Sequence, residues 1–414
     1  MSTGFPHWIK KLAEMCKFFF SFQNRNLLFR LSSFDKARTF FYLTKFLKYK
    51  LFHLDSSLLK HTKIPKVKLV VARDSILNSA TKLMEKFGKT QNILEFEYIN
   101  EQGVGLGPTL EFYSLCSTAL SRKDELWRLI NNAYYFPAPV YSLSKSKEKE
   151  IVALFEFVGT VIAKSLIDDR LFDFPISEIF WEIVLKKTLG LYDMLRFDKA
   201  IGLLLIDLDK IALEKANIER DSTLTNEEKE QRINNLKYKN SKIEELKLYF
   251  SLPGYSEIPL DSHSNDELVT IFSLKEYIDL VVYTTFYSSI SLQVESFIKG
   301  FNKVFPISNL NIFYPNEIED IVCGSSSFNW DEAILRENII AEHGYTSSSP
   351  QFHYLIKYLL SLDNEQKKKF LQYSTGSKRL PFGSFASLNP KLTIVKRLTP
   401  DKMNPNDFLP SVMT

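Results

Sequence analysis

The residue type best suited to covalent chemistry in this sequence is cysteine, which occurs three times, as Cys16, Cys116 and Cys323. A thiolate can be a nucleophile or a metal ligand, but a thiol buried among apolar side chains has a raised pKa and is inert. Cys116 lies on the apolar stripe of a predicted helix, so we interpret it, and the other two cysteines, as structural. Three widely spaced cysteines form neither a disulfide framework nor a zinc site, which favours a reducing compartment.

Two further patterns could bind a metal ion or a phosphate, and neither has the required spacing. His343 and His353 are ten residues apart instead of four, and no carboxylate accompanies them in a motif. The run Gly103–Gly107 follows a predicted strand, but it reads G-x-G-x-G before Pro108, and no acidic residue closes a second strand downstream. We expect no metal and no cofactor, and we interpret the glycine run as a tight turn.

Periodicity predicts the elements that position these residues. Asp74 can cap a helix over 76–87, and the alternation in 94–98 predicts a half-buried strand. The strongest helix is predicted at 151–167, where Gly159 and Ala163 permit close backbone approach. Further predicted elements are helices near 274–287, 291–303 and 350–373, and a strand over Leu392–Val395.

Composition predicts a globular chain with more than one domain. The chain has 414 residues, of which 45% are apolar and 25% charged, which excludes a disordered or collagen-like protein. Residues 207–248 are rich in Lys, Glu and Asn and predict a solvated helical hairpin. The stretch from Gly376 to Pro381 suits a hinge between two bodies, and the residues after it are too few to close a core alone.

The first 60 residues are basic, with eleven Lys/Arg and three Asp/Glu, whereas the rest of the chain carries a net negative charge. A basic arm could contact nucleic acid or an anionic membrane. The same segment contains eleven phenylalanines, which argues against a solvated arm. We therefore expect helices that pack on the main body with their lysines outward, and neither nucleic acid nor membrane as a partner.

Several segments, in order, resemble one family, the catalytic HECT domain of ubiquitin-protein ligases. They cover roughly residues 66–414. The matching segments are Phe96–Tyr98, Glu101–Val104, Pro108–Tyr113, Phe157–Gly159, Ala163–Lys164, Arg170–Leu171, Ser177, Phe180, Gln293, Phe297, Gly300–Phe301, Phe313, Pro315, Glu317, Cys323–Gly324, His343–Thr346, Phe370–Gln372, Thr375–Ser377, Leu380–Pro381 and Leu388–Leu392. The segments Leu252–Tyr255, Leu388–Pro390 and Leu409–Thr414 are similar to the subclass that degrades ubiquitin-fusion proteins.

The resemblance implies a mainly helical α+β fold with two lobes. Residues 1–65 would be a basic, Phe-rich helical extension, and 66–376 a large N-lobe. A small subdomain at about 190–288 would dock the ubiquitin-conjugating enzyme. Residues 377–414 would form the hinge region and a truncated C-lobe, with the hinge itself at Thr375, Gly376 and Ser377.

The resemblance also implies the chemistry, which is two acyl transfers. Ubiquitin passes from the thioester of the conjugating enzyme to a cysteine of the C-lobe, and then to a lysine of a protein substrate that is thereby marked for proteasomal degradation. The family's cysteine directly follows the position of Thr414, so this chain is expected to lack the nucleophile. The alternative is a catalytically dead relative that acts as a scaffold for the conjugating enzyme. Separately, the sequence shows neither a membrane span nor a secretory signal, so we expect a cytoplasmic or nuclear protein.

For docking, the family uses apolar side chains on the helix that here contains Tyr277 and Val281. The two residues are one turn apart, so they share a face and could form an anchor. Leu252 and Tyr255 are weaker candidates. The alternative for Tyr277 and Val281 is that both pack inside the small subdomain.

Overall fold

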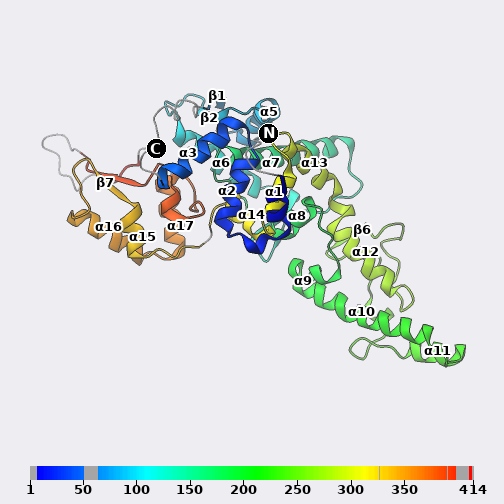
Figure 1. The fold of residues 1–414 in the computed structure, drawn as a ribbon. Coiled ribbons are helices and arrows are strands. Elements are labelled where there is room, and N and C mark those ends of the chain that lie inside the picture. Colours follow the sequence, from blue (N-terminus) through cyan, green and yellow to red (C-terminus); the bar gives the residue numbers. More distant parts are fainter. Residues whose placement is uncertain (1–6, 51–63, 326, 389, 398–409, 413–414) are drawn as a thin grey trace. The chain divides into compact units, whose positions relative to one another are not determined.

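The computed structural model describes residues 7–50, 64–325, 327–388, 390–397 and 410–412 (Figure 1). The chain divides into two units, each built from segments that are distant in sequence. The first comprises Met1–Asp124, Ala153–Glu178 and Phe297–Thr414, and the second Glu125–Val152 and Ile179–Ser296. Helices predominate, and the strands of the described residues form four two-stranded sheets, which confirms the predicted mainly helical α+β class.

A parallel pair of strands and two helices form one part of the first unit. The strands are β1 (Lys66–Val71) and β2 (Ile93–Tyr98), and the helices are α5 (Ile76–Phe87) and α6 (Leu106–Ser121). The predicted strand is confirmed, because Leu94, Phe96 and Tyr98 are buried whereas the glutamates between them are not. The helix at 76–87 is also confirmed. Its N-cap is Ser75 and makes no side-chain hydrogen bond, so the predicted cap at Asp74 is wrong.

The first unit contains the crossing point of two helices, at a pair of glycines. Helix α7 (Lys145–Ile167) contributes Gly159 and α13 (Ser291–Asn302) contributes Gly300. A Cβ atom on Gly159 would lie 2.1 Å from the carbonyl oxygen of Phe297, and one on Gly300 would lie 2.0 Å from that of Glu156. The hydroxyl of Thr160 donates to the carbonyl of Gly300 across the same crossing, at 2.9 Å. The predicted close approach at Gly159 is therefore confirmed.

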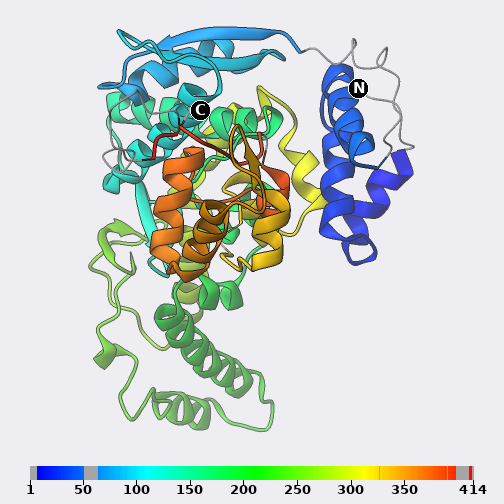
Figure 2. The same cartoon turned by 90° about the vertical axis from the view of Figure 1, so that its left-hand side faces the viewer.

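Three N-terminal helices, α1 (His7–Met15), α2 (Phe22–Ser32) and α3 (Lys36–Lys50), pack on the first unit (blue in Figures 1 and 2). Arg25 of α2 is only 4% exposed and donates two hydrogen bonds of 2.5 Å to the carboxylate of Glu317. Glu317 belongs to α14 (Pro315–Val322). The expected packing of the basic segment is confirmed, but several of its basic side chains point inward, because buried carboxylates and carbonyls accept their hydrogen bonds. Lys10 donates to Asn309, and Lys17 to the carbonyl of Phe313.

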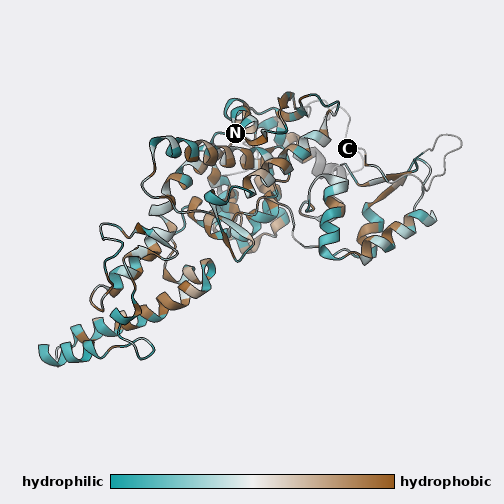
Figure 3. Cartoon of the chain, turned by 180° about the vertical axis from the view of Figure 1, so that it is seen from behind, coloured by the Kyte–Doolittle hydropathy of each residue, from teal (hydrophilic) through white to brown (hydrophobic). Residues whose placement is uncertain are grey.

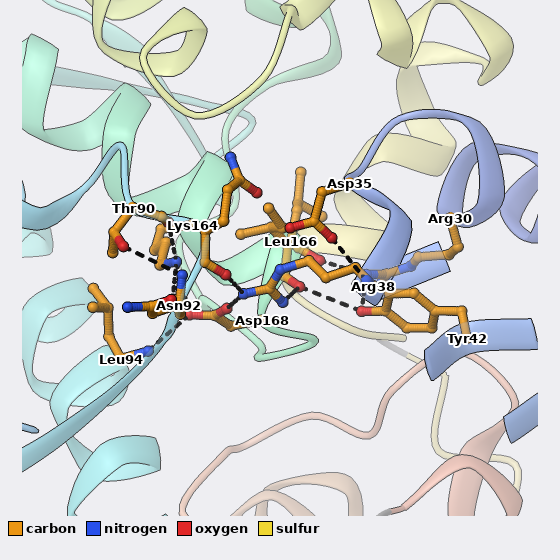
Figure 4. A network of polar contacts seen from close by, with 12 residues as sticks. Arg30, Asp35, Arg38, Tyr42, Thr90, Asn92, Leu94, Lys164, Leu166 and Asp168 are labelled. Carbon is orange, nitrogen blue, oxygen red and sulfur yellow. Dashed lines mark hydrogen bonds and ion pairs between the residues drawn. The ribbon is translucent and has the colours of Figure 1, made fainter. Parts of the chain in front are cut away.

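A second buried ionic network joins α3 to the end of α7 (Figure 4). Arg38, which is 2% exposed, donates to Asp168 at 2.6 Å and to the backbone carbonyl of Ile167. Lys164 lies 3.5 Å from the other oxygen of Asp168 and donates to the carbonyls of Thr90 and Asn92. Burial lowers the pKa of the Lys164 ammonium to about 8, although Asp168 opposes this shift.

The C-terminal part of the first unit has its own core cluster. Its elements are α15 (Glu332–Asn338), β7 (Ile340–Glu342), α16 (Pro350–Ser361), α17 (Asn364–Thr375) and β8 (Thr393–Val395). Strand β8 confirms the strand predicted at Leu392–Val395 and pairs in parallel with β7. The helix predicted over 350–373 is two helices, because Asp363 caps a new one by accepting a hydrogen bond from the backbone N–H of Gln366.

The second unit contains two hairpins and a long helical arm. Its remaining elements are β3 (Trp127–Ile130), β4 (Tyr134–Pro137), α8 (Glu178–Val184, which begins at the boundary), α9 (Met194–Phe197), α10 (Lys199–Arg220), α11 (Asn226–Asn234), β5 (Ser251–Leu252), β6 (Tyr255–Pro259) and α12 (Leu274–Phe286). The charged hairpin predicted at 207–248 corresponds to the end of α10 and to α11, which is mostly hydrophilic in Figure 3. Thr225 and Glu228 form a capping box at α11.

Within the part of the chain that the structure describes, no helix has both the length and the hydropathy needed to cross a bilayer.

Candidate functional site

Two of the three cysteines are buried and are poor nucleophiles. Cys116 and Cys323 are 0% and 1% exposed, and burial raises the pKa of both thiols. Cys16 is half-buried and lies between α1 and the short 3-10 turn that follows it. The structural interpretation of Cys116 and Cys323 is therefore confirmed. Across the described ranges, no group of three His, Cys, Asp or Glu side chains could hold a metal ion.

The side chains predicted to dock a partner lie mostly inside the second unit. Tyr277 is 4% exposed, Val281 0% and Leu252 2%, while Tyr255 is half-buried. The Tyr277 ring meets the ring of Phe250 edge-on at 5.8 Å, and burial raises the pKa of its hydroxyl to about 12. The prediction of an accessible anchor at Tyr277, Val281 and Leu252 is therefore wrong, because the segment around β5 covers this face of α12.

Exposed apolar side chains lie on the outside of the same region. Residues 249 and 268 pair as an isolated antiparallel bridge, so their side chains lie side by side. Phe250 and Val269 are fully buried, whereas Tyr249 and Leu268 are 42% and 38% exposed. Phe272, four residues further along the chain, is 60% exposed and has the ammonium of Lys215 over its ring at 5.3 Å. We call Tyr249, Leu268 and Phe272 the Tyr249 surface.

Sequence periodicity alone did not reveal the Tyr249 surface. The alternation that separates it from the core spans only two or three residues on each side of the bridge, which is too short for a recognisable strand pattern. The alternation becomes meaningful only when the two segments are known to pair.

His263 cross-links this region to α12. Its Nδ1 lies 3.0 Å from a carboxylate oxygen of Glu267, and its Nε2 lies 3.2 Å from one of Glu276. The ring also stacks on Phe250 at 3.8 Å. Burial lowers the pKa of His263, but the hydrogen bonds to the two glutamates raise it by more, so the net shift is upward.

The His263 cross-link predicts a pH dependence. A histidine whose folded pKa is raised adds stability that is fully present below its unfolded pKa of about 6.5 and is lost as pH rises through the folded pKa. We expect the unfolding free energy of wild type, taken relative to that of His263→Gln, to fall by about 1 kcal/mol or less across that range, since both glutamates are exposed. The comparison with the variant removes the opposite contribution of Lys164, whose lowered pKa makes the unfolding free energy rise with pH. Urea unfolding of both proteins at pH 5.5 and 8.5 checks this result. An identical pH dependence in wild type and His263→Gln would contradict the assignment.

The residues predicted to form a hinge are a half-buried turn between two parts of one core cluster. Thr375 ends α17, its hydroxyl donates to the carbonyl of Leu371 at 2.8 Å, and Gly376 caps the helix at φ +77°. Leu371 before this turn and Leu380 and Phe385 after it belong to one buried cluster. The predicted hinge at Thr375, Gly376 and Ser377 is therefore wrong, because the turn is a helix C-cap whose two flanks pack together.

The same cluster indicates a different boundary. Its first member along the chain is Trp330, whereas α14 ends at Val322. The segment between them contains Gly324 and three serines. The backbone N–H of Ser325 donates to the carbonyl of Leu380 at 2.8 Å, so this segment lies beside the chain that leaves α17. The C-terminal core cluster therefore begins at Trp330, well before the predicted division at 376/377.

A large cavity of the first unit adjoins this C-terminal cluster. Its volume is 1670 Å³, and its walls include parts of α2, α6, α17 and the segment Pro410–Val412. Arg379 lies on its wall and pairs with Asp173 at 3.1 Å and with Glu319 at 2.7 Å. The other residues of the Leu409–Thr414 motif, including Thr414, lie outside the described residues.

Comparison with known proteins identifies a family that matches this chain and several similar proteins. A family model described as HECT-domain (ubiquitin-transferase) matches residues 113–414. The chain is 36% identical to the E3 ubiquitin-protein ligase TRIP12 of Danio rerio, over 100% of this chain and 22% of that protein. It is 36% identical to the E3 ubiquitin-protein ligase UPL4 of Arabidopsis thaliana and 32% identical to ubiquitin fusion degradation protein 4 of Saccharomyces cerevisiae, in each case over 100% of this chain and 28% of the relative. The chain thus spans about a quarter of the length of these relatives.

Proposed function

This chain belongs to the HECT-domain (ubiquitin-transferase) family, and from that premise we propose that the protein containing it is a ubiquitin-protein ligase acting through a cysteine thioester. The match over residues 113–414 carries the proposal. The end-to-end similarity to a ubiquitin fusion degradation protein supports the predicted subclass. The substrates would be proteins destined for proteasomal degradation, and the protein would work in the cytoplasm or nucleus.

The reaction consists of two exchanges at one acyl carbon. The acceptor thiolate attacks the carbonyl carbon of the ubiquitin thioester, and the sulfur of the conjugating enzyme leaves as a thiolate. A substrate lysine then attacks the same carbon as a neutral amine, loses a proton, and releases the acceptor thiolate. Cys116 and Cys323 are buried thiols with raised pKa values, so neither is a suitable acceptor. The acceptor in this proposal is the cysteine expected directly after Thr414.

Formation of a ubiquitin adduct tests this assignment. The complete natural protein, mixed with activating enzyme, conjugating enzyme and ubiquitin, should form an adduct that a reductant removes. A variant with Cys16→Ser, Cys116→Ser and Cys323→Ser should form it equally well, and the 414-residue chain alone should form none. Loss of the adduct in the triple variant would overturn the assignment of the acceptor, and its absence in the wild type would overturn the function.

We further propose that the conjugating enzyme docks on the Tyr249 surface. Exposed aromatic and aliphatic side chains beside a buried core are typical anchors. Tyr249 and Leu268 form such a pair, because the next residues along their two segments, Phe250 and Val269, are buried. We expect Tyr249→Ala and Phe272→Ala each to weaken binding of the conjugating enzyme by about tenfold, measured by calorimetry.

Two variants serve as controls for docking. Tyr354→Ala removes an aromatic side chain that is 72% exposed on α16 and should leave binding unchanged. Tyr277→Phe keeps the buried ring in place and should also bind normally. If Tyr277→Phe weakened binding while Tyr249→Ala did not, the buried face of α12 would be the docking site and the present proposal would fail.

A scaffold that binds a conjugating enzyme without accepting ubiquitin is the second candidate function. The observation that favours it is the burial of Cys116 and Cys323, whereas Tyr249, Leu268 and Phe272 are exposed. Binding of the conjugating enzyme by the complete protein, together with no reductant-sensitive adduct, would decide for the scaffold.

A further inference from the structure

We propose that Tyr373 is a positioning residue that holds the segment Pro410–Val412 in place for acyl transfer. This inference rests on the proposed function, because the family places its acceptor cysteine a few residues after that segment. The tyrosine lies on α17, and its hydroxyl group contacts the segment Pro410–Val412.

The contact is a hydrogen bond from a side chain to the backbone. The hydroxyl of Tyr373 donates to the carbonyl oxygen of Pro410, 37 residues further along the chain. Tyr373, Pro410, Ser411 and Val412 all line the same large cavity. The hydroxyl therefore bonds the segment at a wall of this cavity.

The tyrosine itself is held from the opposite side of its helix. Leu371, two residues before it, is fully buried in the C-terminal core cluster. Two hydrogen bonds close the last turn of α17. The hydroxyl of Thr375 donates to the carbonyl oxygen of Leu371, and the backbone N–H of Gly376 donates to the carbonyl oxygen of Gln372. These contacts fix the direction in which Tyr373 projects, without using its ring.

The Tyr373 ring contributes little to the core. Its side chain is 54% exposed, so most of the ring faces solvent or the cavity. Removal of the hydroxyl alone leaves the helix, the core cluster and the ring unchanged. The effect of that removal therefore reports on the segment it binds and not on the stability of the fold.

Positioning matters in this reaction because one sulfur must reach two partners in succession. A nucleophile on a segment with many conformations spends little time in the attacking geometry, and a fixed backbone point close to it reduces that loss. A neutral hydrogen bond to a carbonyl changes the population of the held conformation by roughly two- to tenfold. We expect a rate effect of that size.

The first test uses the 414-residue chain and needs no ubiquitin. The chemical shift of the Pro410 carbonyl carbon is compared in wild type, Tyr373→Phe and the control Tyr354→Phe on α16. We expect this shift to change in Tyr373→Phe only, because the carbonyl oxygen loses its hydrogen-bond donor. An equal shift in the wild type and Tyr373→Phe would overturn the proposed contact.

The second test uses the complete natural protein in a single turnover. Formation and discharge of the ubiquitin adduct are followed separately, together with the thermal unfolding temperature. We expect Tyr373→Phe to slow formation roughly two- to tenfold while the unfolding temperature stays that of wild type. A wild type that forms no adduct would refute the proposed function, whereas a normal adduct in both wild type and Tyr373→Phe would refute only the role of Tyr373.

Discussion

Gly300→Ala should prevent the first unit from reaching its native packing, or destabilise it by about 3 kcal/mol or more. The added methyl carbon would lie 2.0 Å from the carbonyl oxygen of Glu156, which is backbone and cannot rotate away. The helices α7 and α13 would have to separate at their crossing. The hydrogen bond from Thr160 to the Gly300 carbonyl and the ion pairs from Lys299 and Lys303 to Glu156 would be disturbed with it.

Gly190→Ala is the matched control for this prediction. A Cβ atom at Gly190 meets nothing within 4 Å, and its φ of −138° suits any residue. We expect that variant to unfold in urea within about 0.5 kcal/mol of wild type. Gly159→Ala should resemble Gly300→Ala, because its methyl group would meet the Phe297 carbonyl from the other side of the crossing. A native-like midpoint for Gly300→Ala would show that the crossing is looser than described here.

Arg38→Ala should cost the first unit about 3–5 kcal/mol, because it leaves the buried Asp168 carboxylate without its main partner. The Asp168 side chain is 1% exposed, so water cannot replace the guanidinium. Lys164 remains 3.5 Å away but is already engaged by two backbone carbonyls. Urea unfolding, with a check that the slope is unchanged, measures the loss.

An exposed ion pair provides the comparison for Arg38. Arg73 is bonded to Glu101 and Glu111 on the surface, with all three side chains more than one third exposed. Arg73→Ala should therefore cost less than about 1 kcal/mol. In the double variant Arg38→Met with Asp168→Leu, the loss should be smaller than the sum of the two single losses. Equal effects of Arg38→Ala and Arg73→Ala would contradict the buried network.

Local sequence patterns predicted the elements that depend on local geometry. The alternation of apolar and polar residues predicted the strand that contains Phe96, and the small residue Gly159 predicted a close helix crossing. Both predictions depend only on residues that are near one another in the sequence. The pair of Arg38 and Asp168 leaves no such pattern, since 130 residues separate its members. The sequence therefore could not identify Arg38 as a buried charged residue.

The two errors about the site have different physical origins. An apolar face such as that of Tyr277 and Val281 looks the same whether it meets another protein or the chain's own hairpin, so the sequence cannot distinguish an anchor from a core. The turn at Gly376 contains glycine and serine, which are common in hinges, but glycine is also the usual residue that ends a helix. Only the packing of Leu371 with Phe385 shows which role the turn has.

The sequence separation of Arg25 and Glu317 delays the packing of α2 during synthesis. The two residues are 292 positions apart, so at roughly 5–20 residues per second the ribosome makes Glu317 about 15–60 s after Arg25. Throughout that interval α2 lacks the partners of its charged and aromatic side chains, including Phe305, which meets Phe29 edge-on. Helix α2 is thus made long before it can complete its packing, and a nascent chain of this protein presents an aromatic, basic surface for chaperones to cover.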